Sequence, residues 1–296
     1  MTLCSDCEQN AVFSNPSYCK PHFFIYIEKK VKETIEKFNL IEKEDAIAVA
    51  LSGGKDSQTV SYILNKLYPN KVSAIAIDEG IPGYRDNTIK DLKQFCEYNK
   101  IRYKIASFKE SFGTTTADVA KKMRVPCRVC GILRRNLLNL HSEGFNKLAT
   151  GHNLDDECQN IIMNLLKGNT ELSARLGPMS GIMEREGLTR RIKPLYFCTE
   201  KEIAAYAFLK NFPVRFSECP YTANSFRSNV RDALNEAESQ NPGTKQKIAE
   251  RFILMLPQLK ERSTKSALKL CKYCRSPTAG EYCGACNIIK VLKNAI

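Results

Sequence analysis

The chain has 296 residues, of which 43% are hydrophobic, so it is long enough to bury a full α/β core. No apolar run approaches the roughly 20 residues of a transmembrane helix, and residues 1–9 contain cysteines and acids in place of the basic start and apolar stretch of a secretory signal. We therefore expect a cytoplasmic protein without a membrane partner, in which 13 cysteines indicate metal or catalytic sulfur before disulfides and a net charge of +13 suggests a polyanionic partner.

Three zones differ in composition along the chain. Residues 1–23 carry cysteines and are too few to form an apolar core of their own. Residues 24–262 alternate helical and extended patterns, and residues 263–296 return to cysteine pairs with Gly and Pro between them. We expect a central domain flanked by two small modules with these bounds.

The central zone predicts an α/β fold. Apolar residues at three- and four-residue steps predict a helix over 24–38, and a short apolar run predicts a buried strand over 46–51. Further strands are predicted at 72–77, 101–106, 145–150 and 191–195, with helices at 57–67, 84–98, 128–141 and 156–166. This alternation is typical of a parallel sheet covered on both faces, whose ligands bind at the carboxyl ends of the strands. Ser52 and Gly151 fall at such ends.

A glycine-rich loop, Ser52-Gly53-Gly54-Lys55-Asp56-Ser57, directly follows Leu51 and opens a helix. Glycines let backbone N–H groups turn toward an anion, and the helix N-terminus adds partial positive charge. The string is not a Walker A loop, because no Lys-Ser/Thr pair follows the second glycine. A plain strand–helix turn is the simpler alternative, but the whole string predicts a phosphate-binding loop.

Two cysteine sets have the spacing of structural zinc sites. The first consists of Cys4, Cys7, Cys19 and His22, and the second of Cys271, Cys274, Cys283 and Cys286. Four soft ligands in two close pairs can surround Zn²⁺ tetrahedrally, and the metal then replaces a missing core. Disulfides are the alternative, but an expected cytoplasmic location favours two zinc fingers at 1–23 and 263–296.

A third set has no second CxxC pair beside it. Cys127 and Cys130 open a helix, and Cys219 stands alone before Pro220. A redox pair or buried thiols would explain them, while three thiolates can also hold a cubane iron–sulfur cluster with one iron open. Spacing does not establish that the three meet. The stretch from Lys121 to Arg135 contains six Lys or Arg and no acid, which suits a nucleic-acid substrate.

The loop, together with Gly151-His152-Asn153-Leu154-Asp155-Asp156, resembles the PP-loop ATP pyrophosphatase family, which adenylates a carbonyl oxygen. The resemblance implies a PP-loop domain over 24–262, Mg²⁺ with ATP, and Asp156 facing the reacting centre. Helix capping by Asp155 and a structural hydrogen bond by His152 are the alternatives for those residues. The implied ATP-binding residues are Leu51, Ser52, Gly53, Gly54, Lys55, Asp56, Ser57, Ile77 and Gly151.

The cysteines add a narrower resemblance over nearly the whole chain. Both terminal sets, the loop, the CxxC pair and the later Cys-Pro resemble the TtuA and cytosolic thiouridylase group of tRNA 2-thiouridine synthetases. This resemblance implies that Cys127, Cys130 and Cys219 are catalytic and hold a [4Fe-4S] cluster whose open iron carries sulfide. Cys96, Cys158 and Cys198 match no site and are read as buried small hydrophobes.

The implied reaction uses ATP to adenylate the C2 oxygen of a tRNA uridine, which sulfur then replaces. The group has a Lys where this chain has Arg134, so we assign Arg134 to electrostatic stabilisation and not to base catalysis. Arg134-Arg135, Ser225-Phe226-Arg227 and Arg231 favour the wobble uridine over the T-loop uridine at position 54.

Three points stay open at this stage. The chain could use a persulfide on Cys127 or Cys130 without a cluster, or it could be a non-catalytic, zinc-bearing tRNA-binding protein. The sulfur donor could be a ubiquitin-like thiocarboxylate protein or free sulfide. We expect a homodimer.

Overall fold

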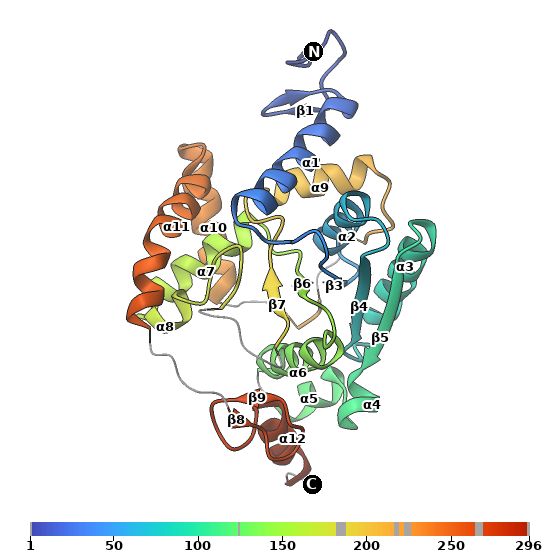
Figure 1. The fold of residues 1–296 in the computed structure, drawn as a ribbon, viewed down its shortest axis with the longest axis vertical. Helices are drawn as coiled ribbons and strands as arrows, with labels where there is room; N and C mark the ends of the chain where they lie inside the picture. Colours follow the sequence, from blue (N-terminus) through green and yellow to red (C-terminus); the bar gives the residue numbers. More distant parts are fainter. Residues whose placement is uncertain are drawn as a thin grey trace.

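The computed structural model describes residues 2–123, 125–181, 188–215, 219–221, 226–263 and 269–294. A sheet with helices around it forms the middle of the molecule, and the two terminal modules lie at opposite ends of its long axis (Figure 1). Each module contains a short antiparallel hairpin, formed by β1 (Phe13–Ser14) and β2 (Ser17–Tyr18) at one end and by β8 (Lys269–Leu270) and β9 (Pro277–Thr278) at the other. Within the described ranges, no helix is long and apolar enough to cross a membrane.

The central sheet has five parallel strands in the order β5-β4-β3-β6-β7. They are β3 (Ile47–Ala50), β4 (Val72–Asp78), β5 (Arg102–Ser107), β6 (Lys147–Ala149) and β7 (Arg190–Ile192). The predicted parallel sheet is therefore confirmed. The expectation that the last strand runs to residue 195 is wrong, since β7 ends at Ile192 and Pro194, which lacks an N–H, follows in a turn.

The strand order creates a switch point between β3 and β6. After β3 the chain moves to β4 on one side, whereas β6 is followed by β7 on the other side. The connections that leave β3 and β6 therefore lead toward opposite edges of the sheet, an arrangement that places a ligand crevice at the carboxyl edge. The glycine-rich loop and the segment from Gly151 to Asp156 begin these two connections.

Twelve helices belong to the described part of the chain, and they include all five predicted ones. Four of those five begin two to four residues earlier than predicted. The helices are α1 (Lys20–Lys37), α2 (Lys55–Leu67), α3 (Arg85–Tyr98), α4 (Phe108–Phe112), α5 (Thr116–Lys122), α6 (Pro126–His141), α7 (Leu154–Leu166), α8 (Thr170–Ser173), α9 (Glu200–Leu209), α10 (Phe226–Gln240), α11 (Thr244–Arg262) and α12 (Gly284–Asn294). Helix α1 thus runs from the N-terminal module into the central domain.

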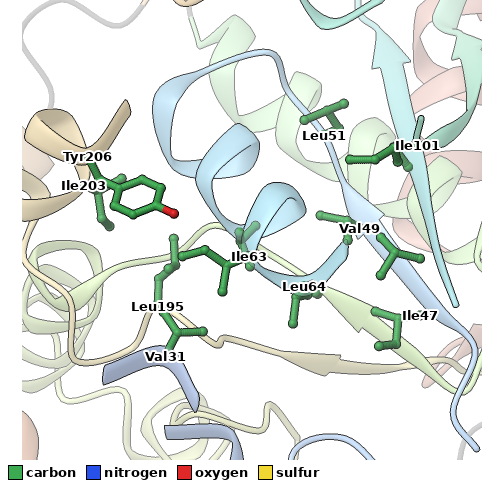
Figure 2. Packing of buried hydrophobic residues seen from close by; sticks show 14 of the residues in the cluster. Val31, Ile47, Val49, Leu51, Ile63, Leu64, Ile101, Leu195, Ile203 and Tyr206 are labelled. Atoms are coloured by element: carbon green, nitrogen blue, oxygen red, sulfur yellow. The ribbon is translucent and has the colours of Figure 1, made fainter. Parts of the chain in front are cut away.

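Side chains alternate between the two faces of the sheet. Ile47 and Val49 of β3 belong to one buried cluster, with residues of α1, α2 and α9, whereas Ala48 belongs to a second cluster on the other face. Figure 2 shows part of the first cluster, in which Ile63 and Leu64 of α2 lie near Ile47 and Val49. Both faces of the central strand β3 are therefore buried, as is typical of a parallel sheet.

The second cluster joins the C-terminal module to the domain. Leu133 and Leu137 of α6 pack in it, and so do Cys271 and Cys283 of the module. Gly284 begins α12 so close to Ile132 that an added Cβ would lie 3.2 Å from that side chain. The module is thus packed against α6, the helix that also carries Cys127 and Cys130.

Candidate active site at the carboxyl edge of the sheet

The glycine-rich loop is held in a narrow turn. Gly53 has φ +88°, and a Cβ at this residue would lie 2.7 Å from the carbonyl oxygen of Thr88, so only glycine fits. Gly54 caps α2 with an extended backbone, and its N–H donates to Ser52 Oγ over 3.3 Å. The Ser52 and Ser57 hydroxyls are 3.1 Å apart. The loop thus presents a helix N-terminus and two hydroxyls to the crevice, a suitable place for a phosphate.

The segment after β6 lies directly against this loop. A Cβ on Gly151 would come within 2.8 Å of the backbone of Asp56 and Ser57, so this position also requires glycine. The Asn153 amide donates to Asp56 Oδ1 over 3.0 Å. The two segments that the sequence singled out therefore form one continuous surface.

Asn153 and Asp156 form a capping box at the start of α7. The Asp156 N–H donates to Asn153 Oδ1 over 3.0 Å, and the Asn153 N–H donates to Asp156 Oδ2 over 3.4 Å. Asp155, the capping alternative from the sequence, does not cap this helix. Burial and, to a smaller extent, the neighbouring Asp56 raise the pKa of Asp156 to about 6, against the attraction of Arg227 at 3.4 Å.

Asp155 has a different role in the structure. Its carboxylate accepts hydrogen bonds from the Glu200 N–H, over 2.7 Å, and from the Lys245 ammonium. The Glu200 carboxylate lies 2.9 Å from Lys55 Nζ, which is also 3.2 Å from Asp56. The start of α9 therefore helps to hold the loop lysine beside the crevice.

A cluster of cationic side chains lies around His152, beside the crevice. The ring Nδ1 lies 2.8 Å from Thr150 Oγ1, which fits the structural hydrogen bond considered from the sequence. His152 keeps solvent-exposed surface, yet burial by the protein around it and, to a smaller extent, nearby cations lower its pKa to about 3. These cations are Lys193, Arg227, Arg134 and Arg191. This cationic cluster is therefore suited to binding anions.

The third cysteine set lies beside this cationic cluster. Cys127 and Cys130 lie in the first turns of α6, and the Cys127 thiol donates to the carbonyl of Tyr221, two residues after Cys219, over 2.9 Å. Burial raises the pKa of the Cys130 and Cys219 thiols, Arg134 lowers both, and the charges of the three cysteines act on one another. The structure thus brings together three residues whose proximity the spacing left open. Ser217 and Glu218, which precede Cys219, and Ser225 lie outside the described residues.

The three thiols of the third set are not gathered as tightly as the ligands of a single metal ion. Within the described ranges, the terminal sets are the groups whose ligand atoms all lie within 4.8 Å of one another, and the third set is not among them. A cubane is wider than one metal ion, so its thiolates stand farther apart than those around zinc. The helix N-terminus and Arg134 both favour thiolates at this place.

Arg134 is tied to the nucleotide loop through two buried charges that sequence reasoning missed. Glu79, 6% exposed, contacts Arg134 Nη1 at 3.5 Å and Arg85 Nε at 2.9 Å. Arg85, 3% exposed, donates to the carbonyls of Ser52 and Ile77. The sequence signal that could have revealed this link was a charged residue, Glu79, directly after a buried strand. The expected adenosine contact, Ile77, has its side chain in the second core cluster.

Both terminal sets have zinc-like geometry. In the first, Cys4 Sγ and Cys19 Sγ lie 3.3 and 3.4 Å from His22 Nδ1, and Cys7 Sγ lies 3.7 Å from Cys19 Sγ. In the second, Cys274 and Cys283 sulfurs are 3.6 Å apart. A zinc–sulfur bond of about 2.3 Å places tetrahedral sulfurs roughly 3.8 Å apart. All four ligand atoms of each set lie within 4.8 Å, so each could hold a metal ion.

Comparison with known proteins identifies the family. The model of the PP-loop domain matches residues 25–238, most of the chain. The chain belongs to the PP-loop family.

Cys96, Cys158 and Cys198, which match no site, are fully buried, as expected from the sequence.

Similar proteins narrow the group within the PP-loop family. The tRNA-5-methyluridine(54) 2-sulfurtransferase of Pyrococcus horikoshii is 37% identical over 90% of this chain and 86% of its own. Cytoplasmic tRNA 2-thiolation protein 1 of Danio rerio is 30% identical over 99% of this chain and 89% of its own. The solved U34-tRNA thiolase NcsA from Methanococcus maripaludis, with its [4Fe-4S] cluster, has 33% identity and a TM-score of 0.83 over 99% of this chain and 97% of its own. The chain is thus a member of the sulfurtransferase group suggested by its motifs.

Proposed function

We propose that this chain replaces the C2 oxygen of a tRNA uridine with sulfur in an ATP-driven reaction. One observation carries the proposal: the glycine-rich loop and the third cysteine set lie at one edge of the sheet, connected through Arg85, Glu79 and Arg134. The likeness to U34-tRNA thiolase NcsA over nearly the whole chain supports it.

In the first half-reaction, the uridine O2 attacks the α-phosphorus of ATP. A C2=N3 double bond forms, the N3 proton leaves and pyrophosphate departs, so the base becomes an O2-adenylate. The loop N–H groups and Lys55 stabilise the pyrophosphate, and Mg²⁺ bound with ATP would reinforce them, with Asp56 close enough to offer an oxygen. Asp156, whose pKa of about 6 is near the working pH, accepts the N3 proton.

In the second half-reaction, sulfide adds to C2, AMP leaves with the former O2, and N3 regains a proton as the C2=S bond forms. A [4Fe-4S] cluster held by Cys127, Cys130 and Cys219 would supply sulfide on its open iron. Arg134, fixed by Glu79, stabilises the negative charge that develops on the nucleotide and on sulfur. A ubiquitin-like thiocarboxylate protein or free sulfide would replenish the sulfur.

Among uridines, the wobble position is favoured. Arg134 lies beside the cysteines, and Arg227 bonds to Gln159 and Asn160 of α7, so two of the basic residues that favour the wobble branch lie near His152. The relatives differ, since one name gives position 54 and one title gives U34. We infer a cytoplasmic homodimer. Analytical ultracentrifugation would measure its mass.

Nucleoside mass spectrometry of tRNA from a strain lacking this protein tests the function. We expect wobble 2-thiouridine to disappear and to return when the gene is restored. Loss of the T-loop form alone would transfer the proposal to position 54. In vitro, tRNA-dependent release of pyrophosphate separates the enzyme from a protein that only binds tRNA, and an unchanged set of nucleosides in the strain would contradict thiolation.

We also propose that the two terminal sets hold structural zinc. Metal analysis should find two zinc ions per chain, because each set gathers four ligands at tetrahedral distances. Chelation should lower the melting temperature, since Cys271 and Cys283 belong to the core cluster over α6. Cys286→Ser should release one of the two ions, whereas Cys158→Ser, outside both sets, should release neither. Retention of both ions by Cys286→Ser would contradict the second site.

A further inference from the structure

A groove of about 1240 Å³ lies away from the nucleotide loop, between α4, α5 and α6 on one side and the C-terminal module on the other. Its walls combine apolar residues, such as Leu137 and Leu140 of α6, with Tyr273 and Tyr282 of the module. Figure 1 shows these elements together at the C-terminal end of the molecule. Neither the nucleotide loop nor the three cysteines line it.

The charge of the groove is positive. Lys121 and Lys122 end α5, and Lys290 extends from α12 on the opposite wall. Among the described residues that line it, Asp118 is the one carboxylate, and it accepts hydrogen bonds from the Thr115 N–H and hydroxyl and pairs with Lys121 at 4.0 Å. The charge of the groove therefore favours binding of a polyanion over binding of a neutral or basic partner.

Aromatic rings supply the second feature. Tyr273 is 78% exposed and Tyr282 is 38% exposed, although large apolar rings are usually covered. Lys290 Nζ lies 5.8 Å from the centre of the Tyr282 ring. Exposed rings interleaved with lysines bind nucleic acid, because a base stacks on the ring while an ammonium meets its phosphate.

The groove is within reach of the reacting position. Lys122 precedes Cys127 by five residues, which span at most about 18 Å of chain. The start of α5 is fixed to the site, since the Thr116 N–H donates to the Glu79 carbonyl over 2.8 Å. A strand of RNA whose uridine is at the cysteines can therefore extend into the groove within a few nucleotides.

We propose that this groove binds a segment of tRNA that flanks the reacting uridine. The proposal rests on the proposed function for the identity of the RNA. A base of that segment stacks on Tyr273, and its phosphates contact Lys121, Lys122 and Lys290.

The first test measures tRNA affinity by fluorescence anisotropy at several salt concentrations, without ATP or sulfur. The Lys121→Ala/Lys122→Ala double variant should bind about tenfold more weakly, and its salt slope should fall by roughly one to two. The control is Lys29→Ala/Lys32→Ala on α1, where both lysines are exposed and lie over the other face of the sheet. The control should bind as wild type does. Equal affinities for both double variants and wild type would overturn the proposal.

A second variant pair tests the stacking. Tyr273→Ala should weaken binding about fivefold or more, whereas Tyr273→Phe, which keeps the ring, should retain the affinity. Zinc content confirms that the module is intact in both. Equal losses in Phe and Ala variants, or conversion of a dimer to a monomer by the lysine variant, would overturn the proposal, the latter because the groove would then join two copies. Failure of thiolation would not affect these binding measurements, so the two proposals fail separately.

Discussion

Cys219→Ala is expected to abolish tRNA thiolation, by roughly 10³-fold or more, while ATP binding stays at the wild-type level. The physical reason is that the ATP loop and the thiols belong to different elements. The loop is held by Gly53, by the hydrogen bonds of Ser57 and by the start of α2. Cys219 instead lies with Cys127 and Cys130, whose charges it influences. Removing one of three cluster ligands therefore removes sulfur transfer alone.

The measurement is made without oxygen, with iron content, 2-thiouridine formation and ATP affinity determined for the same preparation. Cys96→Ala is the matched control, because Cys96 is equally a cysteine but is fully buried among apolar side chains of the first core cluster. It should keep iron and activity. Full activity of Cys219→Ala without iron would contradict the cluster and favour a persulfide on Cys127 or Cys130.

Much of the fold follows from local sequence patterns. Ile47 to Ala50 is a short apolar run that stops at a glycine pair, and both its faces are buried, so periodicity and turn chemistry agree on a strand. The two loops of the crevice could be assigned for the same reason. The last strand was predicted too long because Leu195 is apolar and fully buried, yet the backbone before it already turns. Burial alone does not separate a strand from a buried turn.

The site was less predictable, because long-range contacts decide it. In the sequence, Glu79 is an ordinary charged residue after a strand and Arg85 one at the start of a helix, and only the folded chain shows them buried between the loop carbonyls and Arg134. The residue that caps α7 depended on backbone geometry that favours Asn153 over Asp155. The groove is formed by segments more than a hundred residues apart, at Lys122 and Tyr273, so no local pattern could reveal it.

Asp156→Asn should lower the rate of uridine adenylation by about 10²- to 10⁴-fold, the usual contribution of a positioned base. The carboxylate must be unprotonated to take the N3 proton. Because the pKa of Asp156 is raised to about 6, the wild-type rate should fall as the pH drops through that value, and this acidic limb should vanish in the variant. Pyrophosphate release followed from pH 5 to 8 measures both effects, the range being set at roughly one to two units around the pKa.

The fold itself should tolerate this change. An asparagine side chain can still accept the Asn153 N–H, so the capping box loses little. A carboxyl whose pKa is raised on folding, from an ordinary value of 3.8, weakens folding once it is ionised, and this penalty is absent below the unfolded pKa and complete above the folded one. At neutral pH the variant should therefore melt no lower than wild type. Asp232→Asn, exposed on α10, is the control and should change neither rate nor pH profile. Persistence of the acidic limb in Asp156→Asn would assign the proton to another group, whereas its loss at unchanged stability would show that Asp156 is kept for chemistry and not for the fold.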